Sequence, residues 1–277
     1  MANAIPVLMY HHVSHAPGLV TVSPRTFQAH MTALARAGYT TLSAVQLRDY
    51  LSGEQAVPDK SVAVTFDDGY LDNYVHAYPV LKALGLHAIV FAVTDWIGEG
   101  TPRAFDGGGQ EFPACLNHSS CKAAIASGHA DTAMLRWSEI EVMETDATME
   151  IHSHSHRHVR WDQRYADRTE RLSHLRDDLA ASLQTLRQRL GGRSYQLCWP
   201  WGKFDADYQR VATELGFAAQ YSVDPHPNTV GMGANDIGRF TVKDASAFWL
   251  ASRLWLYSRS GIGELYNTVS GKRRAHG

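Results

Sequence analysis

The stretch SVAVTFDDGY (residues 61–70) joins a strand pattern to a pair of acidic side chains, and the fold class follows from it. Its first six residues are mostly apolar or β-branched, which is typical of a strand buried on both faces of a sheet. Asp67 and Asp68 follow directly and Gly69 comes next, so the backbone can turn there and bring both carboxylates to one site. The alternative is an ordinary Asp-Gly turn with solvated carboxylates.

Strand and helix patterns alternate along the rest of the chain. Further strands are predicted at residues 5–11, 39–42, 87–93, 148–151, 195–199 and 218–222, and helices at residues 24–38, 43–51, 79–85, 137–145, 172–190, 205–215 and 247–257. Such alternation over the length of one domain predicts a parallel α/β fold. With about seven strand–helix units and no phosphate-binding glycine loop after the first strand, we expect a barrel rather than an open nucleotide-binding sheet.

We expect a single domain over residues 1–277 with one insertion. Between residues 98 and 135 the periodicity fails, and DGGGQ, two prolines and two cysteines occur there, which indicates an insertion over one face of the fold. A C-terminal helix and tail are expected from about residue 245. The apolar segment AFWLASRLWLY (residues 247–257) is predicted to be the last barrel helix, and a membrane-surface helix is the alternative.

The composition, 44% apolar and 19% charged residues, is that of a globular protein. A formal net charge of −2 argues against a nucleic-acid partner, and the basic run at residues 272–274 is interpreted as a solvated tail. No apolar run reaches the roughly 18 residues of a membrane span, so membrane association is not favoured. The N-terminal MANAIPVLMYHH has no basic segment or cleavage site. We therefore expect a cytoplasmic protein, or a periplasmic or extracellular one if an export signal has been removed.

The cysteine pattern does not point to a metal site. Cys115, Cys121 and Cys198 form an odd count without a C-x-x-C pair. Free buried thiols are the prediction, and a disulfide between Cys115 and Cys121 is the alternative.

The run MEIHSHSHRHVR (residues 149–160) places four histidines at alternate positions directly after a predicted strand. Imidazole is a good ligand for Zn²⁺, Co²⁺ or Ni²⁺, and two imidazoles can hold one ion together with a carboxylate. Two overlapping pairs have a His-x-x-x-His spacing, His152 with His156 and His154 with His158. The alternative is a solvated, pH-sensitive histidine cluster.

Two more predicted strands end in aromatic or basic side chains. LCWPWGKFD carries Trp199 and Trp201 on either side of a proline, and aromatic faces at the mouth of a barrel suit the apolar faces of sugar rings. Core packing is the alternative for either tryptophan. LMYHHV places His11 and His12 at the end of the first strand, where the active sites of barrels lie. A structural role is the alternative for a lone histidine there.

Together these stretches resemble the polysaccharide deacetylases of the NodB-homology superfamily (carbohydrate esterase family four), and more narrowly the branch that deacetylates poly-N-acetylglucosamine. The sequence TFDDG is similar to the family's first motif, in which the first aspartate is the catalytic base and the second a metal ligand. The resemblance implies these roles for Asp67 and Asp68. The family's second motif is His-[Ser/Thr]-x-x-His after a Glu-Ile-Gly-[Ser/Asn] lead. EIHS at residues 150–153 matches that lead, which implies His154 and His158 as metal ligands.

The third motif of the family, Arg-x-Pro-Tyr-Gly, is only partly present. Here it is Cys198-Trp199-Pro200-Trp201-Gly202, so the arginine is absent and tryptophan replaces tyrosine. In the family a backbone N–H of this loop helps to hold the oxyanion. The resemblance implies that role for the loop here, since a backbone group does not depend on the tyrosine side chain.

Two roles of the family have to be filled from elsewhere in the chain. We expect Arg239 to replace the missing arginine, which in the family positions the catalytic aspartate. The C-terminal Leu-x-His motif that supplies the general acid is not visible. The branch looks circularly permuted, with an N-terminal Tyr-His segment in its place. This resemblance implies His11 as the general acid, with His12 as the second candidate.

The resemblance extends over residues 5–242 and implies an α/β fold, a deformed (β/α)7 barrel. It also implies a metal-dependent hydrolase that removes N-acetyl groups from poly- or oligo-N-acetylglucosamine and releases acetate. The expected cofactor is one divalent ion, zinc first, with cobalt or nickel as alternatives. The functional alternatives are deacylation of a lipid-linked sugar or another small amide, and a catalytically inactive glycan- or metal-binding module. The sequence does not predict the oligomeric state.

Overall fold

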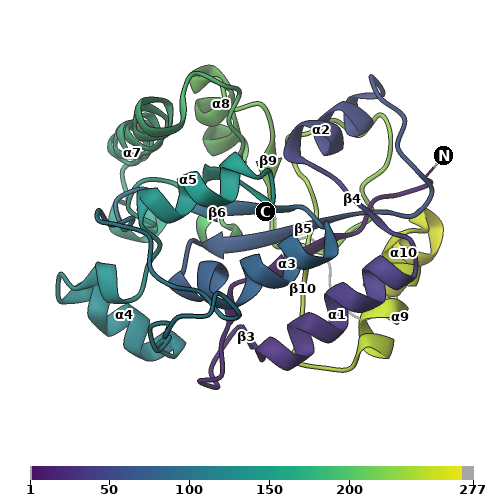
Figure 1. The fold of residues 1–277 in the computed structure, drawn as a ribbon. Helices are drawn as coiled ribbons and strands as arrows, with labels where there is room; N and C mark the ends of the chain where they lie inside the picture. Colours follow the sequence, from purple (N-terminus) through teal and green to yellow (C-terminus); the bar gives the residue numbers. More distant parts are fainter. Residues whose placement is uncertain (1, 270–277) are drawn as a thin grey trace.

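The computed structural model, which describes residues 2–269, confirms the deformed (β/α)7 barrel (Figure 1). Its parallel strands lie in the order β10–β1–β5–β6–β7–β8–β9. Their bounds are β1 (Val7–Tyr10), β5 (Ser61–Asp68), β6 (Ala88–Ala92), β7 (Met149–Ser153), β8 (Leu197–Cys198), β9 (Gln220–Tyr221) and β10 (Phe240–Thr241). A short strand, β4 (Thr40–Thr41), also pairs with β5, and β2 (His12–Val13) pairs with β3 (Thr21–Val22). Within residues 2–269 the two ends of the path, β9 and β10, form no ladder, so the barrel is incomplete there.

Helices cover the outside of the barrel (Figure 1). They are α1 (Pro24–Arg36), α2 (Ala44–Ser52), α3 (Tyr78–Leu84) with the preceding π-helix η1 (Asn73–Ala77), α5 (Trp137–Thr145), α6 (Trp161–Arg164), α7 (Arg168–Leu190), α8 (Ala206–Leu215), α9 (Ala247–Tyr257) and α10 (Ser260–Val269). Their ends follow from local sequence. Ser23 accepts the Thr26 N–H to begin α1, and Gly85, with φ of 63°, ends α3.

The central strand β5 is buried along its whole length, as its apolar sequence predicts. It extends two residues beyond the predicted end, because Asp67 and Asp68 pair in register with Phe91 and Ala92 of β6. Both aspartates are therefore part of the strand, and the chain begins to turn at Asp68. Their carboxylates lie at the C-terminal end of the sheet, where barrel active sites are found.

The segment from residue 98 to 135 contains a helix that the sequence did not predict, α4 (His118–Ala126), and a short 3₁₀ turn, η2 (Ala130–Thr132). The side chain of Asn117 caps α4, but the helix is short and weakly amphipathic, so no periodic apolar pattern marked it. Cys121 packs with Tyr70 and Met134 in a small separate apolar cluster. The segment is thus folded onto the barrel through its own core.

The C-terminal helices pack on one side of the barrel. In α9 the side chains of Leu250, Leu254 and Tyr257 are buried, as expected for a barrel helix, while Phe248 and Trp255 are exposed. No helix within residues 2–269 is long and apolar enough to cross a membrane. The basic run at residues 272–274 lies outside the described residues. Cys115, Cys121 and Cys198 are free thiols, as predicted, but only Cys121 and Cys198 are buried, whereas Cys115 is partly exposed.

Candidate active site

A cavity of about 410 Å³ opens at the C-terminal ends of the strands. Asp67 and Asp68 reach it from the end of β5, His154 and His158 from the loop after β7, and His11 from the residue after β1. Apolar and aromatic side chains form much of the remaining wall. These five polar groups therefore converge on one concave, largely apolar site, which is the usual form of a small-molecule site.

Asp68 ends β5 in an unusual backbone conformation. Its φ of 72° lies in the left-handed region, and Gly69 continues the turn with φ of 85°. Successive strand residues normally point to opposite faces, so this turn is what allows Asp67 and Asp68 to line the same cavity. Asp68 Oδ1 is buried and has no hydrogen-bond partner among residues 2–269. A buried carboxylate oxygen in this state is costly unless a cation completes it.

His154 and His158 face that oxygen. Their Nε2 atoms lie 3.4 Å and 3.5 Å from Asp68 Oδ1, and one potential ligand atom from each of the three residues lies within 4.8 Å of the others. His154 Nδ1 donates to the carbonyl of Cys198 at 2.9 Å, which leaves Nε2 as the lone-pair atom. Burial lowers the pKa of His158 to about 4, against the opposing charge of Asp68. Two neutral imidazoles and a carboxylate fit a divalent ion with open coordination positions.

The other two histidines of the run lie apart from this group. His152 Nδ1 accepts the Gln196 N–H at 3.1 Å, and His156 Nδ1 lies 2.8 Å from Thr94 Oγ1. The chain leaves the strand after Ser153, and Ser155 turns it with φ of 68°. Of the two overlapping pairs in the sequence, the structure brings together His154 and His158.

Asp67 forms a buried bidentate ion pair with Arg239. The Asp67 Oδ1 and Oδ2 atoms accept from Arg239 Nη1 and Nη2 at 2.6 Å and 2.8 Å. Arg239 Nε also donates to the carbonyl of Ser222 at 2.9 Å, which fixes the guanidinium plane. Burial by itself would raise the pKa of Asp67, but the guanidinium holds it well below its usual range. Arg239 therefore occupies the place expected for a replacement of the missing motif arginine.

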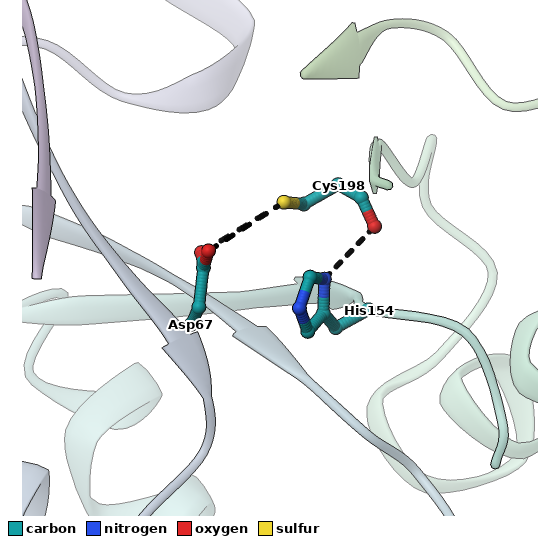
Figure 2. A group of neighbouring side chains, drawn as sticks. All are labelled: Asp67, His154 and Cys198. Atoms are coloured by element: carbon teal, nitrogen blue, oxygen red, sulfur yellow. Dashed lines mark hydrogen bonds between the residues drawn. The ribbon is translucent and has the colours of Figure 1, made fainter. Parts of the chain in front are cut away.

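Cys198 lies next to Asp67 and His154 (Figure 2). Its Sγ is 3.8 Å from both Asp67 oxygens and 2.9 Å from Arg239 Nη2, while its carbonyl accepts from His154. Asp67, His154 and Cys198 thus form a second group with metal-ligand spacing. It fits an ion less well than the first group, because both oxygens of Asp67 already accept from Arg239.

His11 is the imidazole next to Asp67. Its Nε2 lies 3.9 Å from Asp67 Oδ2, so the two face each other without a direct hydrogen bond. Burial lowers the pKa of His11, and the nearby carboxylates of Asp67 and Asp68 oppose that change. The protonated ring would therefore give up its proton readily.

His12 does not face the cavity, which corrects the expectation that it lies on the same rim as His11. Its side chain is completely buried, its Nδ1 bonds to Asp72 Oδ2 at 2.6 Å, and its Nε2 lies 3.2 Å from His118 Nδ1. Adjacent residues of an extended chain point to opposite sides, so only one of the two histidines can line the cavity.

The two tryptophans of the WPWG loop separate in the same way. Trp201 is half-exposed and lines the cavity, with its ring 5.2 Å from that of His158. Trp199 is only 1% exposed and packs on Phe204, so its side chain has no face for a sugar, and the expectation of substrate contact is corrected for it. Trp201 has φ of 59°, a strained value for a bulky residue.

Pro200 and Gly202 shape this loop without lining the cavity. Both are buried, and the N–H of Gly202 donates to the carbonyl of Trp199 at 2.9 Å. Gly202 has φ of 62°, and a Cβ there would come within 2.2 Å of Val223. Pro200 and Gly202 thus fix the backbone that presents Trp201.

Sequence reasoning missed much of the cavity wall. Trp96 and Tyr70 line it, and so do His118 and Lys122 of α4. Tyr70 follows the aspartates closely enough that the DDGY sequence was a usable signal. His118 and Lys122 lie in a segment without a periodic pattern, so no signal in one sequence marked them.

Comparison with known proteins places the chain in a family. The family model described as "Polysaccharide deacetylase" matches residues 54–220. The protein YxkH of Bacillus subtilis (strain 168) is 43% identical over 94 residues, which are 34% of this chain and 33% of that protein. The poly-beta-1,6-N-acetyl-D-glucosamine N-deacetylase of Escherichia coli (strain K12) is 21% identical over 229 residues, 80% of this chain and 34% of that protein. The matches thus span about a third of the length of these curated relatives.

Solved structures share the fold over nearly the whole chain. The Streptococcus pyogenes deacetylase PplD in complex with acetate superposes with a TM-score of 0.72 at 20% identity, over 92% of this chain and 99% of that one. IcaB from Ammonifex degensii superposes with a TM-score of 0.69 at 23% identity, over 94% of this chain and 99% of that one. The fold and the family model, which covers more than half of the chain, agree. The chain belongs to the polysaccharide deacetylase family.

Proposed function

We propose that this protein is a metal-dependent N-deacetylase that hydrolyses the acetamide groups of N-acetylated amino sugars and releases acetate. Poly- or oligo-N-acetylglucosamine is the proposed substrate class. The observation that carries the proposal is the group of the buried Asp68 and His154 with the partly buried His158, beside the ion-paired Asp67. The similarity to the E. coli N-deacetylase and to a deacetylase solved with acetate supports the same reaction.

Asp68, His154 and His158 would hold one divalent ion. Zinc is the first choice and cobalt or nickel the alternatives, because two imidazoles and one carboxylate suit these ions. When bound, such an ion supplies Lewis-acid polarisation of the amide carbonyl and lowers the pKa of a coordinated water. The remaining chemistry falls on side chains and backbone groups of this chain.

Asp67 takes the proton of the attacking water. The contacts of Arg239 with both oxygens keep Asp67 ionised at neutral pH and fix the direction of the carboxylate. A base that is held in place contributes about 10²–10⁴-fold to such a reaction. Arg239 acts through Asp67 and is a positioning residue.

The amine leaves only if it is protonated as the carbon–nitrogen bond breaks. His11 supplies that proton, since it lies beside Asp67 and gives up a proton readily. The backbone N–H of Trp201 stabilises the charge that develops on the carbonyl oxygen, in the role of an oxyanion-hole donor. The left-handed conformation of Trp201 turns that backbone at the cavity wall.

The cavity has the size and surface for one sugar unit. Its volume of about 410 Å³ lies in the range of small-molecule sites. Trp96 and Trp201 line it with partly exposed aromatic rings, which suit the apolar faces of a pyranose. We therefore place the N-acetylated unit in this cavity, with the glycan chain continuing beyond it.

The test is acetate release from β-1,6-linked N-acetylglucosamine oligomers by zinc-loaded protein. We expect release by the wild type, its loss with a chelator, and a decrease of at least about 10²-fold in Asp67→Asn. Zinc content should be unchanged in Asp67→Asn and lost in His158→Ala.

Two outcomes would contradict the proposal in different ways. Acetate release that persists in Asp67→Asn would refute the assignment of the base but not of the reaction. Absence of release by zinc-loaded wild type, with bound zinc verified, would refute N-deacetylation of these oligomers. A matched control is Asp162→Asn, an aspartate on α6 whose ion pair with Arg160 lies outside the cavity.

A further inference from the structure

A buried chain of hydrogen bonds runs from the barrel to the cavity through residues that the proposed reaction does not use. Asp72 Oδ2 bonds to His12 Nδ1 at 2.6 Å, and His12 Nε2 lies 3.2 Å from His118 Nδ1. The ring of His12 also stacks on that of Tyr70, with 3.7 Å between the centroids. His118 begins α4 and lines the cavity. The imidazole of His118 is thus the outer end of a chain anchored in the barrel.

The hydrogen-bond partners decide which atom of His118 is free. Asp72 Oδ1 accepts the N–H of Val13 at 3.2 Å and the side-chain N–H of Asn73 at 2.9 Å, so both oxygens of Asp72 act as acceptors. His12 Nδ1 therefore carries a hydrogen, and a single proton lies between His12 Nε2 and His118 Nδ1. That leaves Nε2 of His118 for a ligand. It accepts a hydrogen bond while both rings are neutral and donates one after the pair gains a proton.

One face of α4 borders the cavity. His118, Lys122, Ile125 and Ala126 all line it, and their spacings of four, three and one put them on the same side of the helix. Lys122 Nζ lies 5.3 Å from the centroid of the Trp201 ring. This combination of polar groups and an apolar strip is complementary to a sugar ring, which has hydroxyls at its rim and C–H groups on its faces.

We propose that α4 is a substrate-binding wall in which His118 Nε2 hydrogen-bonds a hydroxyl of the N-acetylated sugar unit. This proposal rests on the proposed function, and it identifies the groups by which the same cavity selects its substrate. A sugar hydroxyl donates and accepts, so it matches His118 Nε2 in either protonation state. His12 and Asp72 are positioning residues that hold the imidazole, and Ile125 and Ala126 supply the apolar strip. The segment around residues 98–135, with α4 at the edge of the molecule in Figure 1, thereby contributes to specificity.

The alternative is a purely structural role, in which the same chain of hydrogen bonds only fastens α4 to the barrel. Two substitutions separate the roles, because the amide of asparagine reaches about as far as Nδ1 of histidine, and that of glutamine about as far as Nε2. His118→Asn keeps a partner for His12 and removes the group in the cavity. His118→Gln keeps a polar group in the cavity and gives up the contact with His12.

The experiment measures KM, kcat and melting temperature for both variants with N-acetylglucosamine oligomers. In His118→Asn we expect KM to rise about three- to tenfold with kcat and melting temperature nearly unchanged, the size of one neutral hydrogen bond. In His118→Gln we expect the reverse, a lower melting temperature and a KM within about twofold of wild type. A drop in melting temperature in His118→Asn together with an unchanged KM would overturn the proposal in favour of the purely structural role.

Oligomers in which the N-acetylated unit lacks one hydroxyl give a second readout that needs no turnover. Their Kd is measured by calorimetry in the zinc-loaded Asp67→Asn background, with His118 or Asn at position 118. Removal of the contacted hydroxyl should weaken binding to the His118 protein and not to the His118→Asn protein, a coupling that only a direct contact produces.

The outcomes separate the two proposals. Equal losses for every deoxy oligomer in both proteins, with wild-type deacetylation intact, would refute the hydroxyl contact and leave the proposed function standing. Absence of deacetylation by wild type would refute the proposed function, and the Kd coupling would then decide the hydroxyl contact by itself. Absence of both deacetylation and oligomer binding would refute both.

Discussion

Two regions of the molecule border the same cavity and are built in opposite ways. The strand edge consists of Asp67 and Asp68 at the end of β5 and of His154 and His158 in the loop after β7, and all of them but His158 are buried. The α4 wall carries His118 and the other cavity-facing residues of α4 on a helix outside the barrel. The strand edge is held by the main sheet, whereas the α4 wall rests on a small apolar cluster and a few polar contacts.

The difference separates reaction from selection. A base and a set of metal ligands have to keep their mutual distances, and paired buried strands provide that rigidity. A wall that contacts the substrate away from the reacting bond can be replaced without loss of the chemistry. We therefore expect changes in the strand edge to affect kcat and global stability, and changes in the α4 wall to affect KM and local stability.

The largest effect is expected from Arg239→Met. It leaves the buried carboxylate of Asp67 without its partner, which costs about 3–5 kcal/mol of unfolding free energy. Arg239 lowers the pKa of Asp67 whereas burial raises it, so the pKa rises in the variant. The ionised base is then lost at a higher pH, and the acidic limb of the kcat/KM profile moves to higher pH. Urea unfolding and the pH–rate profile measure the two effects.

The double variant Asp67→Leu, Arg239→Met is the matched control for that prediction. Replacing both members of a buried pair by apolar side chains removes the unpaired charge, so much of the lost stability should return. The double variant should be inactive, unlike Arg239→Met, because the base is gone. A double variant as unstable as Arg239→Met would show that the ion pair is not the reason for the destabilisation.

Arg103→Met tests the α4 wall in the same way. Arg103 donates to both oxygens of Glu139, at 2.7 Å and 2.8 Å, and to the carbonyls of Asp131 and Met134. Its loss leaves the fully buried Glu139 without its cation, at a cost of about 3 kcal/mol. We expect hydrogen exchange to accelerate mainly in residues 98–135, with zinc binding retained. Uniform acceleration across β5 and β7 would contradict the separation of the two regions.

The sequence carried enough information for the barrel and for the strand edge. Buried strands appear as apolar runs, and Asp67, Asp68 and the histidine run follow such strands directly, so their convergence was predictable. Arg239 was harder, because only tertiary pairing of β1 with β10 brings it next to Asp67.

The α4 wall could not be predicted for a physical reason. The nine residues of α4 are mostly small or polar, and the helix is stabilised by the cap of Asn117 and by contacts with Tyr70 and Met134. Such contacts depend on the three-dimensional fold and leave no period in the sequence. The same limit applies to His12 and Trp199, since neighbouring residues with the same chemistry differ only in the direction of their side chains.

A smaller effect is expected from Gly202→Ala, in the loop that places Trp201 next to His158 of the strand edge. The new Cβ would lie 2.2 Å from Val223 Cγ2 at a φ of 62°, so overpacking and backbone strain add, at a cost of about 2–4 kcal/mol and a displaced Trp201. Gly38→Ala is the control, because its φ of 72° imposes the strain without any atom within 4 Å, and should cost about 1 kcal/mol. A melting temperature equal in the two variants would exclude the contact with Val223 as a constraint on the loop.

The smallest change in stability is expected at Asp146, which belongs neither to the strand edge nor to the α4 wall. It tests whether changes in kcat and KM require a residue that borders the cavity or follow from the loss of any polar contact. Burial would raise the pKa of Asp146, but hydrogen bonds from Lys82, Tyr78 and Thr148 lower it to about 2. A pKa below that of the unfolded chain stabilises the fold above about pH 4, and this contribution disappears as the pH falls through 2. Asp146→Asn should therefore cost about 0.3–1 kcal/mol at pH 7, since solvent screens the partly exposed pair, and the difference from wild type should shrink towards pH 2.

Urea midpoints of both proteins between pH 7 and pH 2.5 measure this difference in stability. A difference that does not change with pH would mean that the carboxylate is not stabilised by these contacts. Because Asp146 touches neither region, kcat and KM should both stay at their wild-type values, unlike those of Arg239→Met and His118→Asn.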